Sequence, residues 1–196
     1  MSSLPPRGDY YRALYDVAKS VNSSLSLPQV LVLIAESTAK AMGTKACSVR
    51  LLDPMREQLE ISAEYGLSPS YILKGPVKVS KSPIDAEVLE GRTVQIYEAG
   101  GDPRLQYPEE VAREGIASIL AVPVAVRDTI IGVMRVYTAE PREFSADEVE
   151  FLAAVANLGG IAIENARLYQ TLEAEFQAIR REKIPWAENW AKPRWR

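Results

Sequence analysis

Apolar residues recur at the spacing of an α-helix in two stretches near the start of the chain. In the first stretch they follow steps of four, three and four residues, which predicts an amphipathic helix with one apolar face: Tyr10, Leu14, Val17 and Val21. The second stretch begins after Ser26, a residue suited to cap a helix, carries Pro28 in its first turn and ends at Gly43. We expect residues 1–9 to form a flexible lead.

The pattern then changes to the alternation of period two that is typical of strands. Two hairpins are expected, with strands over residues 46–52, residues 58–65 and the two halves of 117–137. The second hairpin turns around Asp128, a residue type that tolerates a positive φ. Pro123 lies inside its first strand, and because proline has no N–H, that strand should be an edge there or carry a bulge.

The section between the hairpins is rich in glycine and proline. It contains a short helix that ends at Gly91, a strand over residues 93–98 and a second short helix that ends at Gly115. Together with the two hairpins and the helices at both ends of the chain, these elements predict an α+β fold, with helices flanking a mainly antiparallel sheet.

The last predicted helix spans about residues 146–181 and begins with a capping box between Ser145 and Glu148. Gly159 and Gly160 lie inside it, where each costs about 1 kcal/mol relative to alanine. The sequence around them lacks G-x-G-x-x-G and a following Lys-Ser/Thr, so it is not a phosphate loop. We expect these glycines to let the helix approach a neighbouring element closely.

Composition restricts the chemistry that the chain can perform. The 196 residues are 47% hydrophobic and 25% charged, as in an ordinary soluble domain. There is no histidine and a single cysteine, Cys47, which excludes histidine-dependent catalysis, histidine-ligated haem, and standard zinc and iron–sulfur sites. Catalysis by paired carboxylates stays open in principle, but nothing in the sequence points to it, so we expect no catalytic residue, no metal and no cofactor. No export signal or membrane-spanning run is visible, so the expected location is the cytoplasm.

The order of these elements resembles that of a GAF domain over about residues 10–180. The resemblance is carried by two helices followed by "CSVRLLD", "ISAEYGL", "ILAVPVAVRDTIIGVMRVY" and "FSADEVEFLAAVANLGGIAIENARLYQTL". It implies a central antiparallel sheet of about six strands, with the N- and C-terminal helices on one face and variable short helices and loops enclosing a ligand pocket on the other. It also implies a non-catalytic sensory or regulatory module of signal transduction that acts through dimerisation and a partner protein.

GAF domains that bind different ligands need different residues, and several of these residues are missing from this chain. Bilin-binding members use a cysteine in the loop that corresponds to about residues 98–116, haem-binding members use a histidine, and members that reduce free methionine sulfoxide need several cysteines. None of these sets is present. Cyclic-nucleotide members carry Asn-Lys before Phe-x-x-x-Asp-Glu, whereas this chain has "YTAEPRE" and the shorter "FSADE". The first three activities are excluded and the fourth is unsupported.

By analogy with the family, eight residues are expected to line the pocket: Ser48, Arg50, Tyr65, Ile84, Asp85, Tyr107, Ser118 and Arg135. An arginine inside a sheet needs an anionic partner or access to solvent, so Arg50 and Arg135 suggest a ligand that carries a carboxylate or a phosphate. Two alternatives remain open at this stage. The arginines are exposed or pair with Glu60, Glu64 or Glu98, or the pocket is empty and vestigial.

The last helix carries a heptad seam that is apolar except for Asn165, which would fix the register: Val155, Leu158, Ala162, Asn165, Tyr169, Leu172, Phe176 and Ile179. Beyond Asn165 a single domain offers little for this seam to pack against. Parallel pairing of two copies would bury it together with the apolar face of the first helix, as the family usually does. The expected homodimer interface is Tyr10, Leu14, Val17, Val21, Leu158, Ala162, Asn165, Tyr169, Leu172 and Phe176. Alternatively, the last helix packs only on the first helix of its own chain.

Residues 181–196 form a basic, tryptophan-rich tail. It contains all three tryptophans of the chain, and from Arg180 onward six cationic side chains face two acidic ones. We expect this tail to dock on a partner protein through Trp186, Trp190, Trp195 and Arg194. No nucleic acid or membrane is expected as a partner. The alternatives are that the tail packs on its own acidic domain, or that the chain is a ligand-free accessory subunit of a larger complex.

Overall fold

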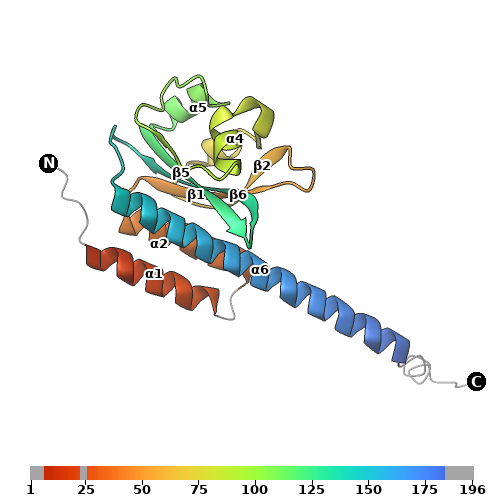
Figure 1. Ribbon diagram of the computed structural model, residues 1–196. Helices are drawn as coiled ribbons and strands as arrows, with labels where there is room; N and C mark the ends of the chain where they lie inside the picture. Colours follow the sequence, from red (N-terminus) through yellow and green to blue (C-terminus); the bar gives the residue numbers. More distant parts are fainter. Residues whose placement is uncertain (1–6, 23–25, 184–196) are drawn as a thin grey trace, which may run out of the picture.

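Six strands form one antiparallel sheet in the order β3-β2-β1-β6-β5-β4 (Figure 1). The computed structural model describes residues 7–22 and 26–183. The strands are β1 (Ala46–Leu52), β2 (Gln58–Tyr65), β3 (Val77–Lys78), β4 (Val94–Ile96), β5 (Ser118–Val126) and β6 (Thr129–Thr138). β1 with β2 and β5 with β6 form the two hairpins that the alternation predicted, and the α+β fold with a six-stranded sheet is confirmed.

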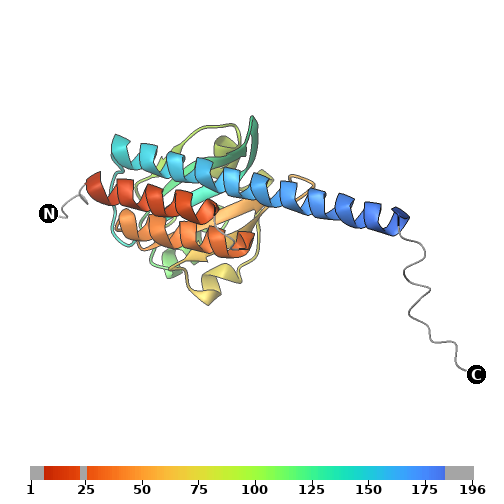
Figure 2. The same ribbon diagram turned by 90° about the horizontal axis from the view of Figure 1, so that it is seen from below.

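Three long helices lie on one side of the sheet: α1 (Arg7–Val21), α2 (Leu27–Ala41) and α6 (Ala146–Lys183). α2 and the first half of α6 pack against the strands, and α1 packs on both of these helices (Figures 1 and 2). This side holds one hydrophobic core, in which Ile34, Leu120 and Leu152 are fully buried. The second half of α6 continues past the edge of the domain (Figures 1 and 2).

Short helices and loops cover the opposite face of the sheet: α3 (Pro69–Ile72), the 3-10 turn η1 (Val79–Lys81), α4 (Pro83–Leu89) and α5 (Pro108–Arg113). A second hydrophobic core lies between them and the sheet, with Leu59, Ile84 and Val133 fully buried. α3, β3 and η1 had no signal in the hydrophobic pattern, because elements of two to four residues are too short to show a period.

The ends of the elements follow local chemistry. Ser145 caps α6: its N–H donates to a Glu148 carboxylate oxygen at 2.8 Å, as the capping box predicted. Pro123 lies beyond the part of β5 that pairs with β4, so it is an edge residue on that side, also as predicted. Two expectations were wrong. The hairpin turn places Arg127, and not Asp128, at positive φ (52°), and α1 begins at Arg7, inside the expected lead.

The two glycines of α6 have different surroundings. A Cβ at Gly160 would overlap the carbonyl oxygen of Ala125 in β5, whereas a Cβ at Gly159 would meet nothing within 4 Å. Gly160 therefore lets the helix lie directly on the backbone of the sheet, at the bulge between Val124 and Ala125. Close packing is the reason for Gly160 alone.

Candidate functional site

The face of the sheet under the short helices carries a row of polar side chains in its two central strands. Ser48 and Arg50 of β1, and Arg135 and Tyr137 of β6, are all buried on this face, because they alternate with residues that point to the long helices. Ser48 pairs directly with Arg135 across the two strands, and its hydroxyl lies 2.8 Å from that of Tyr137. Polar groups at the centre of a sheet require partners.

Arg135 has its partner in α4. Its guanidinium donates to the carboxylate of Asp85, and the Ser82 hydroxyl donates to the other carboxylate oxygen of Asp85 at 2.6 Å. Arg135 is 3% exposed and Asp85 0% exposed, so the pair is sealed from water. The Asp85 carboxylate holds the pKa of Arg135 above its usual value against the opposing effect of burial. The sequence-based alternatives for this partner, Glu60, Glu64 and Glu98, are wrong for Arg135.

Arg50 has no such partner. Its side chain is fully buried, and within the described residues none of its three guanidinium nitrogens makes a hydrogen bond. A buried cation that lacks both a counter-ion and hydrogen bonds is strongly unfavourable. Within the described residues, the protein thus maintains an uncompensated positive charge inside the domain.

Lys74 lies in the segment between α3 and β3, and together with Asp85 and Arg135 it lines a small chamber above the sheet. Its ammonium lies 3.5 Å from the ring centroid of Tyr71 and 5.6 Å from that of Tyr107, and it donates to the carbonyl of Tyr71 at 3.2 Å. Burial, together with the nearby charges of Arg50 and Arg135, lowers the pKa of Lys74 to about 7. A second cation is therefore held close to the uncompensated one.

The chamber between α3, α4, the α5 region and the sheet is small. The space left free between its walls is about 10 Å³, roughly enough for one water molecule. Ten residues line it: Tyr71, Lys74, Val77, Ser82, Asp85, Leu105, Gln106, Tyr107, Val111 and Arg135. A ligand larger than water would have to displace part of the wall that α3 and the following segment supply.

A surface groove of about 380 Å³ lies on the other side of Tyr71, between α3 and α5. Glu114, after α5, holds this wall in place: its carboxylate accepts from the backbone N–H of Ser68 at 3.0 Å and from the Ser68 hydroxyl, and its carbonyl accepts from Lys45. Since Tyr71 lines both the groove and the chamber, it is the side chain that separates them. This wall is fastened by a few polar contacts, in contrast to the sheet beneath it.

Of the eight residues expected to line the pocket, Asp85, Tyr107 and Arg135 line the chamber, and Ser48 and Arg50 are buried beside them on the same face of the sheet. Ile84 lies in the adjoining core and contributes no polar group. Tyr65 points to the long helices, because it pairs with Cys47, whose side chain faces that way. The Ser118 hydroxyl is used by the backbone of Tyr97 and Arg142. Tyr65 and Ser118 are therefore removed from the site.

Four residues of the site were missing from the sequence-based set: Tyr71, Lys74, Ser82 and Tyr137. Tyr137 had a usable signal, because it alternates with Arg135 along β6 and so shares its face. Ser82 precedes α4 by one residue and could have been found as a possible N-terminal cap. Tyr71 and Lys74 lie in and after a one-turn helix with no periodicity, so only the folded chain places them.

The residues expected at a dimer interface divide into two groups. Tyr10 and Val17 of α1 are buried in their own chain, where Tyr10 stacks on Phe151 with ring centroids 4.4 Å apart, and Leu14 and Val21 pack at the edge of the same core. Ala162 is buried and Leu158 and Asn165 are partly so. Tyr169, Leu172 and Phe176 are exposed, as are the neighbouring Leu168 and Ile179. Packing within one chain thus accounts for the first group only.

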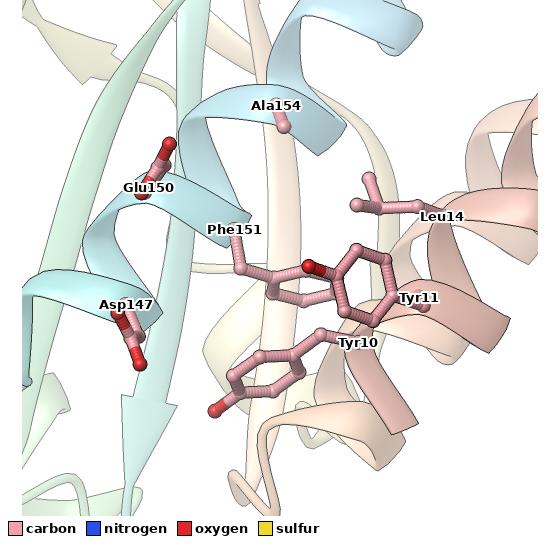
Figure 3. A pocket seen from close by; sticks show the side chains of 7 residues that line it. All are labelled: Tyr10, Tyr11, Leu14, Asp147, Glu150, Phe151 and Ala154. Carbon is pink, nitrogen blue, oxygen red and sulfur yellow. The ribbon is translucent and has the colours of Figure 1, made fainter. Parts of the chain in front are cut away.

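A groove of about 360 Å³ runs between α1 and the start of α6 (Figure 3). Tyr11 and Leu14 line it from α1, and Asp147, Glu150 and Ala154 line it from α6, with the stacked Tyr10 and Phe151 at its floor. Tyr11 is 73% exposed. The groove is on the side of the domain away from the chamber, so it is a surface feature of the helical layer and not an entrance.

The tail residues, the single cysteine, and the expected absence of a metal site and of a membrane span remain to be compared with the structure. Trp186, Trp190, Arg194 and Trp195 lie outside the described residues. The Cys47 thiol is buried in the helical core, and burial raises its pKa, so this thiol is a poor nucleophile. Among residues 7–22 and 26–183, acidic and sulfur side chains form no cluster of three that could hold a metal ion. Within the same ranges, no helix carries an apolar stretch sufficient to cross a bilayer.

Comparison with known proteins gives one consistent family. The model of the GAF domain matches residues 26–163. Among curated proteins, the chain is 28% identical over 166 residues to a methyl sulfide methyltransferase-associated sensor from Methanosarcina acetivorans. The match covers 80% of this chain but 16% of that protein, so the chain spans a small part of the length of this relative.

Solved structures share the fold. The GAF domain of an Acinetobacter phosphoenolpyruvate-protein phosphotransferase is 26% identical with a TM-score of 0.68, covering 81% of this chain and 94% of that one. The equivalent domain from Coxiella burnetii is 20% identical with a TM-score of 0.74, covering 84% and 98%. A free methionine-R-sulfoxide reductase from Neisseria meningitidis, solved with its substrate, is 16% identical with a TM-score of 0.67, covering 82% and 91%. The same fold thus serves sensory proteins and an enzyme, and the side chains of the site must decide between these roles.

Proposed function

Because the chain belongs to the GAF domain family, whose members are generally sensory or regulatory modules, we propose that it is a non-catalytic sensor that binds a small anionic ligand beside Arg50. The ligand carries a carboxylate or a phosphate group. Binding displaces the wall formed by α3 and the segment that contains Lys74, and this displacement is the signal.

The observation that carries this proposal is the unpartnered guanidinium of Arg50. Arg135 already has Asp85 as its counter-ion, so it does not need a ligand. Arg50 lies in the middle strand pair of the sheet. Its backbone is held in place, because β1 is hydrogen-bonded to β2 on one side and to β6 on the other. A rigid, dry guanidinium is a strong binding site for a carboxylate or a phosphate, since it offers paired N–H donors.

The experiment is a thermal-shift and calorimetric screen of small carboxylates and phosphates against the wild-type chain and Arg50→Met. The expected result is that one class of anion raises Tm in the wild type and has no effect on Arg50→Met. Arg127→Met is the matched control, because Arg127 is an exposed arginine in the β5–β6 turn. Anions that stabilise the wild type and Arg50→Met equally would contradict the proposal, as would a screen in which no anion binds.

Output from such a sensor requires a second copy or a partner, and α6 is the element suited to both. Its exposed apolar residues Tyr169, Leu172, Phe176 and Ile179 continue the heptad positions of the buried Val155 and Ala162. In a parallel pair of α6 helices in this register, Glu175 would face Arg180 of the other copy, since they occupy g and e positions five residues apart. These features support a homodimer with its seam along α6.

The tail that follows α6 supports contact with another protein. Its tryptophans and arginines are the residue types that dominate protein–protein interfaces. The function proposed is therefore a dimeric cytoplasmic module that passes a ligand signal along α6 to a partner bound near residues 184–196. Absence of a reactive thiol at Cys47 supports the non-catalytic role.

A further inference from the structure

The charges in and beside the chamber do not balance. Lys74, Arg135 and Asp85 line the chamber, and the buried cation of Arg50 lies close enough to Lys74 to affect its charge. Arg135 and Asp85 form a closed ion pair that is neutral as a unit. The remaining charge is that of Arg50 together with that of Lys74 when its amine is protonated. A complementary ligand must therefore neutralise two cations and not one.

The ammonium of Lys74 is held where it can serve as the second binding group. It lines the chamber beside Asp85 and Arg135, and it donates one hydrogen bond to the Tyr71 carbonyl, which leaves further N–H donors for a ligand. Tyr71, whose ring lies under the ammonium, also stacks edge-on against Tyr137 at a centroid distance of 6.3 Å, next to Ser48 and Arg135. Lys74 and the sheet thus enclose the same small volume from opposite sides.

We propose that the ligand is a small dianion, either a dicarboxylate or a tetrahedral dianion such as a phosphate monoester, which Arg50 and Lys74 bind together while Lys74 takes up a proton. The inference rests on the proposed function, since it requires that an anion binds at Arg50. It adds the charge of the ligand, the second residue that recognises it and a coupling of binding to pH.

Several charged and titratable groups face Lys74 from the elements packed around it. Arg50 from β1 and Arg135 from β6 disfavour its charged form, whereas Glu110 and Glu114 of the α5 region favour it. Asp85 from α4 and the rings of Tyr71 and Tyr107 complete its surroundings. Asp85 is already paired with Arg135, and the Glu114 carboxylate is shared with Ser68 and Lys45. Lys74, whose pKa is about 7, is therefore a group whose protonation an incoming anion can change.

The direction of the pH effect follows from the pKa of about 7 that Lys74 has in the ligand-free protein. An anion beside the amine raises this pKa toward the usual value for lysine, so the bound state holds more protons than the free state between pH 7 and pH 10. Affinity for the dianion must then be highest below pH 7 and fall as the pH rises. Between pH 7 and pH 9 the expected loss of affinity is roughly tenfold or more.

The experiment measures affinity by calorimetry between pH 6.5 and pH 9 with probes whose own charge is constant in that range. Succinate is the dicarboxylate and sulfate the tetrahedral dianion, while propionate and methyl sulfate are the matched monoanions. Titrations in HEPES and in Tris, which have different ionisation enthalpies, report the number of protons taken up. We expect at least one dianion to bind more tightly than its monoanion, with proton uptake at pH 8. Binding of succinate would identify the ligand as a dicarboxylate, and binding of sulfate would identify it as a tetrahedral dianion.

Two substitutions separate recognition by Lys74 from a structural role. Lys74→Arg keeps a permanent cation, so the preference for the dianion should remain while proton uptake disappears. Lys74→Met removes the cation, so the dianion should bind no better than the monoanion at any pH. Lys81→Met, at an exposed lysine of η1, is the control and should behave as the wild type.

The two proposals fail differently. If monoanions bind as tightly as dianions, or if dianions bind without proton uptake, the role of Lys74 is wrong and an anion site at Arg50 remains. If none of the four probes binds to the wild type, the dianion proposal is wrong, and the anion site at Arg50 is overturned as well if the wider screen of carboxylates and phosphates finds no binding.

Discussion

Arg50 is a buried residue whose side chain opposes the stability of the ligand-free domain. Replacing buried ionic groups with apolar ones of similar size is often neutral or stabilising by about 1–4 kcal/mol, and the gain should be larger where no partner is left behind. Arg50→Met should therefore raise the free energy of unfolding by at least about 1 kcal/mol while abolishing anion binding. Urea denaturation of both proteins without anions tests this. A less stable Arg50→Met would contradict the interpretation that the guanidinium is uncompensated.

Arg135 and Asp85 should behave in the opposite way, because each is the other's partner. Asp85→Asn leaves a buried guanidinium without its counter-ion, and breaking such a pair costs about 3–5 kcal/mol. The double variant Asp85→Asn/Arg135→Met should recover much of this loss. A double-mutant cycle by urea denaturation measures the coupling. If the two single losses simply add, the pair is not a closed unit, and the balance of charge in the chamber must be revised.

The elements of the fold were predictable to the extent that each had a period or a cap. The strands of both hairpins and the start of α6 at Ser145 follow from local sequence, since alternation and capping act within a few residues. The sequence also identified Arg50 and Arg135 as the informative side chains. The sequence did not show that Arg135 has an ionic partner and Arg50 has none, because the pairing of Asp85 with Arg135 depends on where α4 lies across the sheet. Lys74 was missed for the same reason.

At the scale of one element, α6 provides a matched pair of substitutions. Gly160→Ala introduces a Cβ into the carbonyl oxygen of Ala125, so helix and sheet must separate or distort, and we expect a loss of about 1–3 kcal/mol. Gly159→Ala adds a methyl group to open space and should gain up to about 1 kcal/mol from helix propensity. Thermal unfolding of the two variants measures both changes in stability. Equal effects would show that the approach of α6 to β5 does not depend on Gly160.

The whole molecule is a domain with one long helix that leaves it. Along the described part of α6, the large apolar residues from Leu168 to Ile179 are at least half exposed, and burying them is the main gain available from dimerisation. The double variant Leu172→Glu/Phe176→Glu should convert a dimer to a monomer without lowering the Tm of the domain by more than a few degrees. Analytical ultracentrifugation measures the oligomeric state.

Met55→Glu is the matched control for this pair. Met55 is also an exposed apolar residue, at 75%, but it lies in the turn between β1 and β2, away from α6. Its replacement should leave the dimer intact. A wild-type chain that sediments as a monomer would overturn the homodimer.

The unpartnered charge of Arg50 also has a consequence for the lifetime of the protein in a cell. A ligand that binds only the folded chain adds its binding energy to folding, so the ligand-free molecule opens more often and presents more unfolded backbone to proteases. Here the difference is enlarged, because the same anion removes an internal electrostatic cost that the empty domain carries at all times. The abundance of the protein would then follow the concentration of its ligand over hours, in addition to the fast conformational response of the domain to binding.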